Sequence, residues 1–280
     1  MKVVKTVKEM QQLAERLRRK GKVGFVPTMG ALHQGHLELI RIAQRRCDWV
    51  VVSIFVNPIQ FGPKEDYRNY PRNLTQDQKL LRERGVDVLF YPEVLEMYPE
   101  NYSTYVEVEG LTRYLCGRSR PGHFRGVATV VTKLFNIVKP HQAVFGQKDA
   151  QQAFVIKRMV RDLNFDVEIV VVPTVREADG LALSSRNSYL TGAERRQAVV
   201  LHHALRHAEE MIKQGERNPE KVKRAMRRLI HRASTGKIDY VAIVDTTLLA
   251  PVKEIKGEVL VALAVYFGRA RLIDNFIIRV

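Results

Sequence analysis

Apolar, β-branched runs alternate with segments of helical period through the first two-thirds of this 280-residue chain. Runs such as VGFVP and WVVVSIFV have the length of buried strands, whereas GHLELIRIAQRRC repeats its apolar residues every three or four positions. Strands that each return through a helix form a parallel sheet with helices on both faces. The pattern therefore predicts the α/β class with a doubly wound, Rossmann-like sheet, whose ligands bind at the carboxyl ends of the strands.

The pattern changes near residue 184, where two helical segments precede three strand-like runs. This order is typical of a small α+β unit, and the sequence READG before it has the composition of a hinge or linker. We therefore expect a Rossmann-like domain over residues 1–175 and a smaller α+β domain over 176–280. The expected strands are 23–27, 49–56, 86–92, 142–146, 165–173, 238–245, 258–267 and 270–280, and the expected helices are 35–47, 74–85, 126–140, 149–164, 191–215 and 219–234.

The chain carries 46 Lys and Arg against 30 Asp and Glu, which leaves a net charge of +16. Such an excess is typical either of a nucleic-acid surface or of a site for small polyanions. The basic residues are spread along the chain, and many lie in segments patterned like solvated helix faces. Because no basic cluster is interleaved with aromatic residues, we expect small anionic substrates and no nucleic-acid partner.

The apolar runs, the N-terminal residues and the cysteines all bear on where in the cell the protein works. The longest apolar runs, WVVVSIFV and VLVALAVYF, are far shorter than the roughly 18 residues of a membrane span. The first twenty residues carry charge throughout, unlike a secretory signal. The two cysteines, Cys47 and Cys116, lack C-x-x-C spacing and are predicted to be reduced thiols. We expect a cytoplasmic protein with no membrane partner.

Two histidines flank a glycine in PTMGALHQGH, directly after the expected strand 23–27. Their i, i+3 spacing places His33 and His36 on one face of the first turn of the next helix, whose free N–H groups favour an anion. Either both imidazoles donate hydrogen bonds to one phosphate, or His33 caps the helix and His36 belongs to the core. Neither G-x-x-x-x-G-K-[ST] nor G-x-G-x-x-G occurs in the chain, so this turn is the candidate phosphate site.

The His-x-Gly-His pattern resembles the motif of the nucleotidylyltransferase and class I aminoacyl-tRNA synthetase superfamily, which acts at the α-phosphate of ATP. Longer segments narrow the resemblance: VPTMGALHQGH, VVSIFVNPIQFGPKEDYRNYPR, FGQKDAQQ and VPTVREADGLALSSRNSYL. Together and in this order they resemble the pantothenate synthetase family, the AMP-forming pantoate:β-alanine ligases. The resemblance is dense over residues 1–190. Ala150 departs from it, because an aromatic residue is common after Lys-Asp in the family.

The resemblance also implies roles for individual residues. His33, His36, Lys148 and Arg186 are the implied catalytic residues, with the LSSRN loop closing over the β and γ phosphates. The implied ATP-binding residues are Met29, Gly30, His33, His36, Gly146, Gln147, Lys148, Asp149, Val175, Leu183, Ser184, Ser185 and Arg186. The implied pantoate-binding residues are Pro27, Thr28, Met29, Asn57, Gln60 and Gln152, and Gln60 is also implied for β-alanine. No metal ligand can be assigned.

Structural explanations remain open for several of these residues. Lys148 fits a solvated loop, and Asp149 is sufficiently explained as a helix cap. Ser184 and Ser185 fit a pair that caps the next helix. Asn57 fits a turn residue before proline as well as it fits a ligand contact.

Three further positions carry weaker signals. Arg125 lies between glycines in RPGHFRG, which favours an exposed loop and a contact to substrate or pyrophosphate. Asp77 could assist β-alanine or magnesium, but we expect a solvent-facing helix carboxylate. The same expectation applies to Glu65 and Asp66.

The family resemblance implies that domain 1–175 binds nucleotide and pantoate and that domain 176–280 forms a lid. It also implies ATP and Mg²⁺ as cofactors and a homodimer as the assembly. In the implied reaction, pantoate is first adenylated and β-alanine then displaces AMP. A nucleotidylyltransferase with the same fold would need more cations around its acceptor, and Asn57, Gln60 and Gln152 argue against it. An RNA-binding module is disfavoured by the dispersed charge.

Overall fold

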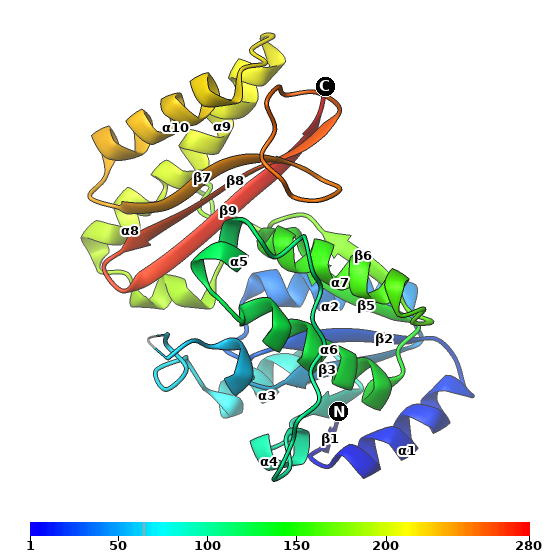
Figure 1. Cartoon of the computed structure of the whole chain (residues 1–280). Helices are drawn as coiled ribbons and strands as arrows, with labels where there is room; N and C mark the ends of the chain where they lie inside the picture. Colours follow the sequence, from blue (N-terminus) through cyan, green and yellow to red (C-terminus); the bar gives the residue numbers. More distant parts are fainter. Residues whose placement is uncertain (64) are drawn as a thin grey trace. The chain divides into compact units, whose positions relative to one another are not determined.

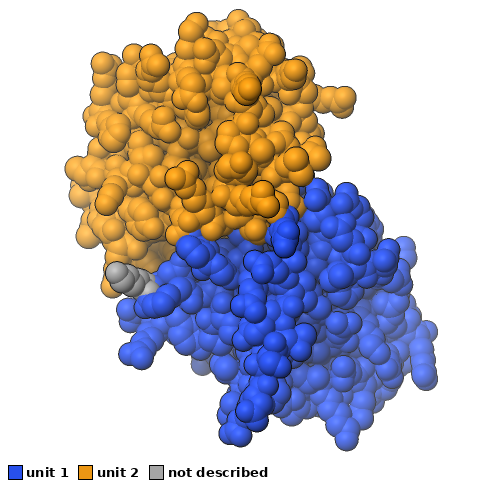
Figure 2. Space-filling view, viewed as in Figure 1, with its two compact units in different colours: residues 1–109, 120–146, 152–173 blue, residues 110–119, 147–151, 174–280 orange. Residues whose placement is uncertain are grey.

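The computed structural model describes residues 1–63 and 65–280. Contacts divide the chain into two compact units, which Figure 2 colours separately. Unit 1 comprises Met1–Glu109, Arg120–Gly146 and Gln152–Pro173, and unit 2 comprises Gly110–Ser119, Gln147–Gln151 and Thr174–Val280. A single cut after residue 175 therefore leaves out two short segments that belong to unit 2. The lid role of the second unit stays a prediction.

Within its described residues, unit 1 contains a six-stranded parallel sheet in the order β1-β4-β3-β2-β5-β6 (Figure 1). The chain steps from β2 to β3 and β4 in one direction and from β5 to β6 in the other, so the order reverses between β2 and β5. The doubly wound prediction is confirmed, and the reversal marks the ligand crevice beyond the carboxyl ends of β2 and β5. The strands are β1 (Lys2–Val4), β2 (Val23–Thr28), β3 (Trp49–Ile54), β4 (Val88–Phe90), β5 (Gln142–Gly146) and β6 (Glu168–Val172).

Helices cover both faces of this sheet. On one face, Leu37 and Ile40 of α2 and Leu81 of α3 share a core cluster with Val26 and Val52 of the strands. On the other face, α1 and α6 both contact β2. The helices of unit 1 are α1 (Val7–Arg18), α2 (Gln34–Arg46), α3 (Leu74–Glu83), α4 (Val94–Met97), α6 (His123–Val138) and α7 (Ala150–Asp162), the last of which begins in unit 2.

Unit 2 is built on an antiparallel sheet within residues 174–280, all of which are described. Its strands, β7 (Lys237–Asp245), β8 (Glu258–Phe267) and β9 (Ala270–Arg279), lie in that order. The apolar stripes of α9 (Val200–Lys213) and α10 (Pro219–Ala233) pack on this sheet around Leu201, Met226 and Val261. The α+β prediction is confirmed, although the expected helix 191–215 divides at Val199 into α8 (Gly192–Ala198) and α9.

The predicted linker READG is an ordered hairpin in unit 2. The Leu183 N–H donates to the Val175 carbonyl at 3.0 Å, and Gly180 supplies the turn with a φ of +94°. Arg176 joins the hairpin to β9 through two bonds to the buried Asp274 carboxylate, at 2.6 and 3.0 Å. These bonds fix the hairpin to its own unit.

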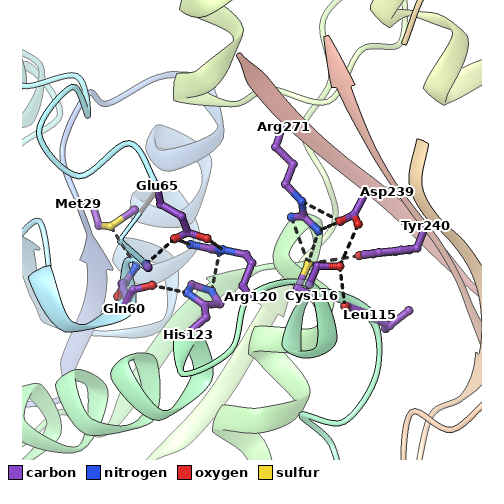
Figure 3. A network of polar contacts seen from close by, with 12 residues as sticks. Met29, Gln60, Glu65, Leu115, Cys116, Arg120, His123, Asp239, Tyr240 and Arg271 are labelled. Atoms are coloured by element: carbon purple, nitrogen blue, oxygen red, sulfur yellow. Dashed lines mark hydrogen bonds and ion pairs between the residues drawn. The ribbon is translucent and has the colours of Figure 1, made fainter. Parts of the chain in front are cut away.

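A partly buried polar cluster secures segment 110–119, which contains α5 (Leu115–Ser119), within unit 2 (Figure 3). The Cys116 thiol lies 3.3 Å from the Tyr240 hydroxyl, and Arg271 donates to Asp239 at 2.6 and 3.0 Å while also reaching Cys116. Gln151 accepts a bond from the Cys116 N–H at 2.9 Å.

Over the described residues, no helix is both long and apolar enough to cross a membrane.

Candidate functional site

The turn between β2 and α2 orients both motif histidines. His33 is the N-cap of α2, and its Nδ1 accepts a bond from the Gly35 N–H at 3.1 Å. The His33 N–H in turn donates to Nδ1 of His36 at 3.3 Å, and the two rings lie 4.1 Å apart. Because Nδ1 accepts in each ring, the neutral imidazole carries its proton on Nε2. The cap therefore fixes the tautomer of both rings, with Nδ1 as acceptor and Nε2–H as donor.

The loop before this turn has an unusual backbone. Gly30 and Ala31 have φ values of +84° and +50°, in the left-handed region that non-glycine residues rarely occupy. Thr28 stabilises its start, because Oγ1 accepts from the Gly30 N–H at 3.2 Å and donates to the Ser53 carbonyl at 2.8 Å. Thr28 is only 8% exposed. These contacts give it a structural role beside the predicted pantoate contact.

Asp77 is buried, and the expectation of a solvent-facing carboxylate is wrong. Its side chain is 2% exposed and accepts bonds from the N–H groups of Ala31 at 2.9 Å and Leu32 at 2.8 Å. Burial raises the pKa of the Asp77 carboxyl above its ordinary value, while the two backbone N–H groups act to lower it. Asp77 lies in the first turn of α3, so α3 holds the loop that leads to His33.

Asn57 and Gln60 form an oriented pair of amides after β3. Asn57 is 1% exposed; its Nδ2 donates to Gln60 Oε1 at 3.0 Å and to the Gly126 carbonyl at 3.1 Å, while its Oδ1 accepts from the Tyr98 hydroxyl at 2.8 Å. Gln60 Oε1 is thus an acceptor inside the protein, and its Nε2 is directed to Met29 Sδ at 3.2 Å. The sequence predicted that both amides contact pantoate. The observed contacts make Asn57 the residue that orients Gln60.

An ion pair supports Gln60 from its backbone side (Figure 3). Arg120 forms two bonds to Glu65, at 2.6 and 2.8 Å, and donates to Nε2 of His123 at 2.9 Å. Since arginine only donates, His123 accepts at Nε2 and donates from Nδ1 to the Gln60 carbonyl at 2.9 Å. The expectation that Glu65 faces solvent is therefore wrong. Asp66 beside it, for which the same was expected, is half-buried.

Arg125 lies within helix α6, not in the exposed loop that its flanking glycines indicated. Its guanidinium stacks over the Tyr105 ring at 3.9 Å from the centroid.

Gly126 allows close packing, because a Cβ there would lie 2.5 Å from the Ile59 carbonyl oxygen. Glycine at this position lets α6 approach the turn that carries Gln60.

A cavity of ≈ 270 Å³ lies within unit 1, beyond the carboxyl ends of β3 and β4. Met29, Gly30 and Asp77 line it on the side of the β2–α2 loop, and Phe55 and Tyr91 line it on the sheet side. At Gly146, which ends β5, an added Cβ would meet no atom of the described residues within 4 Å. Both features leave space at the carboxyl edge of the sheet.

Unit 2 contributes a second group of predicted ATP-binding residues. Lys148 and Asp149 lie in a 3₁₀ turn, with Nζ of Lys148 3.4 Å from the Asp149 carboxylate. Asn275 of β9, 4% exposed, donates to the carbonyls of Gln147 at 3.0 Å and Lys148 at 2.9 Å. The backbone that carries Lys148 is thus held by a buried amide.

The LSSRN segment forms a 3₁₀ turn over Ser185–Tyr189 where an irregular loop was expected. Ser184 caps this turn, because its Oγ accepts from the Arg186 N–H at 3.3 Å. Leu183 and Val175 pair at the base of the hairpin described above. The turn and hairpin thus bring the predicted residues 175 and 183–186 together inside unit 2.

Comparison with known proteins identifies the family. The model of the pantoate-beta-alanine ligase family matches residues 2–277. The chain belongs to this family. Pantothenate synthetase of Thermotoga petrophila is 58% identical over 99% of this chain and 100% of its own, and that of Moorella thermoacetica is 57% identical over 100% and 99%.

Solved structures of the same family agree with the fold. Pantothenate synthetase from Thermus thermophilus has a TM-score of 0.93 at 51% identity, covering 99% of each chain. Pantoate-beta-alanine ligase from Francisella tularensis, solved in complex with beta-gamma ATP and beta-alanine, has a TM-score of 0.82 at 38% identity over 99% of this chain and 97% of its own.

Sequence reasoning missed several residues that hold the predicted site residues in place. Asp77 had a detectable signal, because it shares the apolar row of Leu74 and Leu81 on α3. Asn275 and the Glu65–Arg120 pair act across long sequence separations and gave no local signal. Two predicted pantoate residues remain: Gln152 is half-buried on α7, and Pro27 is half-buried in β2. In the described part of the chain, no group of three or more His, Cys, Asp or Glu could hold a metal ion.

Proposed function

We propose that this chain condenses pantoate with β-alanine at the expense of ATP, giving pantothenate, AMP and pyrophosphate. The observation that carries the proposal is the family match over residues 2–277. In the first step a carboxylate oxygen of pantoate attacks the α-phosphorus and pyrophosphate leaves. In the second step the β-alanine amine attacks the acyl carbon of pantoyl adenylate, the bond to AMP breaks, and the amine loses a proton.

The proposed work of His33 and His36 is electrostatic. Each ring has its Nε2–H as donor because Nδ1 accepts a backbone bond. Donors fixed before reaction stabilise the charge that grows on phosphate oxygens without any cost of reorientation. The N-terminus of α2 adds a positive dipole end at the same turn. No protein nucleophile takes part.

Lys148, Ser184, Ser185 and Arg186 are proposed to bind the phosphates from unit 2, and Asp149 to bind the ribose. The Asn275 bonds to the carbonyls of Gln147 and Lys148 support this proposal, because a fixed backbone limits where the ammonium can reach. Unit 2 is proposed to act as the lid. Closure would keep water from hydrolysing the adenylate.

Gln60 is proposed to donate from Nε2 to an oxygen of pantoate. The support is the orientation of its amide: Oε1 is held by Asn57, and Nε2 is directed to the Met29 thioether, a weak acceptor that a ligand oxygen can replace. Gln152 and the backbone near Met29 complete the proposed pantoate pocket. β-Alanine is proposed to approach past Gln60.

ATP is proposed to enter as its Mg²⁺ complex, with the ion on the phosphates and water, as is usual for this small, strongly hydrated cation. A homodimer, which the family resemblance implies, and a cytoplasmic location, which the charged N-terminal residues and the short apolar runs predict, belong to the same proposal.

The test is product analysis with purified protein, ATP, MgCl₂, pantoate and β-alanine. We expect AMP, pyrophosphate and pantothenate in equal amounts, and pantoate-dependent exchange of labelled pyrophosphate into ATP without β-alanine. ADP as the stoichiometric product would overturn the adenylate route. Turnover with a phosphorylated acceptor in place of pantoate would favour a nucleotidylyltransferase instead.

A further inference from the structure

One carboxylate reaches the loop that leads to the motif histidines. Asp77 projects from the first turn of α3 and accepts bonds from two successive N–H groups, Ala31 at 2.9 Å and Leu32 at 2.8 Å. The next residue along the chain is His33, the N-cap of α2. A single buried acceptor therefore sets the backbone immediately before the proposed phosphate donors.

The loop needs such an acceptor. Ala31 has a φ of +50°, which an L-residue adopts only when its surroundings hold it there. Gly30 packs directly on the carboxylate, because a Cβ at Gly30 would lie 3.0 Å from Asp77 Oδ2 and 3.0 Å from Ile54 Cγ2. Both the left-handed backbone of Ala31 and the close packing at Gly30 therefore depend on the Asp77 carboxylate.

We propose that Asp77 is a positioning residue for adenylation. Its ionised carboxylate fixes residues 30–32, and through them the imidazoles of His33 and His36, in the geometry that meets the α-phosphate. This inference rests on the proposed function. An ionised acceptor can bind both N–H groups at once. Asparagine has the same shape but would direct an NH₂ donor at one of them.

The cavity beside the loop provides a direct test. Asp77 lines it together with Met29 and Gly30, and its volume of ≈ 270 Å³ far exceeds that of one small anion. Truncation to alanine therefore opens a path from the cavity to the two N–H groups. Formate carries the same carboxylate and is small enough to replace the missing side chain. Asparagine leaves no such space.

The experiment compares Asp77→Asn and Asp77→Ala with Asp87→Asn and Asp87→Ala, using pantoate-dependent ATP–pyrophosphate exchange and thermal unfolding. Asp87 is the matched control, because its carboxylate also accepts a backbone bond, from the Val50 N–H at 2.7 Å, but at the amino end of β3. We expect both Asp77 variants to lose about 10²-fold in exchange rate, since displacement of reacting groups by about 1 Å has that effect. We expect formate to raise the rate of Asp77→Ala only. The Asp87 variants should exchange normally.

Three results would overturn the proposal. One is an Asp77→Asn exchange rate within about twofold of wild type. Another is an equal loss in the Asp77 and Asp87 variants at equal loss of melting temperature, because the effect would then come from fold stability. The third is folded Asp77→Ala that formate does not restore. If the wild type itself shows no pantoate-dependent exchange, the proposed function fails and this inference fails with it.

Discussion

The amino ends and the carboxyl ends of the parallel strands, called here the amino edge and the carboxyl edge of the sheet, use the same chemical groups for different purposes. At the amino edge, Asp87 accepts from the backbone at the start of β3 at 2.7 Å, and His141 Nδ1 accepts from the start of β2 at 2.9 Å. At the carboxyl edge, Asp77 accepts two backbone bonds and His33 Nδ1 accepts one. Carboxylate and imidazole acceptors therefore occur at both ends of the parallel strands.

The two edges differ in the backbone segments that these acceptors bind. At the amino edge they satisfy N–H groups where extended strands begin, which is a requirement of folding alone. At the carboxyl edge they hold the left-handed residue Ala31, its neighbour Leu32, and the start of a helix whose dipole favours anions. A backbone acceptor thus becomes functionally important when the segment it holds faces the ligand edge.

The largest expected effect is a difference in adenylation rate between variants of the carboxyl-edge histidines and a variant of the amino-edge histidine. Replacing His33, His36 or Lys148 by alanine should lower the adenylation rate by about 10²–10³ each, as loss of a fixed donor to developing charge does. His141→Ala should exchange normally. The measurement is ATP–pyrophosphate exchange on folded variants, checked by circular dichroism. A motif histidine whose removal leaves turnover near normal would be only a helix cap.

An effect of intermediate size should separate two buried glutamines. Gln60 lies at the carboxyl edge, whereas Gln142 begins β5 at the amino edge and donates to Glu168 at 2.6 Å. A pantoate analogue without the hydroxyl next to the carboxylate should react about 10- to 100-fold more slowly, because an unpaired buried donor costs roughly 1–3 kcal/mol. The penalty should shrink in Gln60→Ala and persist in Gln142→Ala. Equal discrimination by wild type and Gln60→Ala would remove Gln60 from the pocket.

Local pattern was enough for the sheet and for the position of the motif turn. The alternation of strand and helix periods predicted the doubly wound unit, and the missing phosphate-loop motifs directed attention to His33 and His36. Helix α1 was not predicted, although its buried residues recur every three or four positions. Strand β1 was not predicted either, because only three residues form it and they pair with the distant β4. Short strands of this kind are defined by their partner.

Side-chain partners were harder to predict than elements. Asp77 was assigned to solvent because charged helix residues usually lie there, although its spacing to Leu74 and Leu81 placed it on the buried row. Asn275 joins the backbone of residue 148 across 127 positions, which no local pattern encodes. Asn57 was singled out as a pantoate contact, which stays a prediction, and only its contacts in the structure show that it orients Gln60.

The smallest effect concerns the amino edge, in stability rather than rate. Burial, followed by the nearby charge of Arg18, lowers the pKa of His141 below 6.5, while Asp166 acts in the opposite direction. A lowered histidine pKa means that the fold favours the neutral ring, whose Nδ1 accepts from the Val23 N–H. The stabilisation is therefore present above pH 6.5 and is lost as the pH falls through the lower pKa of the folded state.

His141→Ala should accordingly be less stable than wild type by about 0.5–1 kcal/mol at pH 7.5, a value near the low end for one hydrogen bond because the ring is partly exposed. At pH 5 the difference should shrink, because below pH 6.5 the unfolded state binds a proton at His141 more readily than the folded state does. Urea unfolding at the two pH values measures both gaps, and His33→Ala tests whether the carboxyl edge behaves alike. A gap that is constant or larger at pH 5 would show that His141 stabilises β2 through packing and not through its neutral nitrogen.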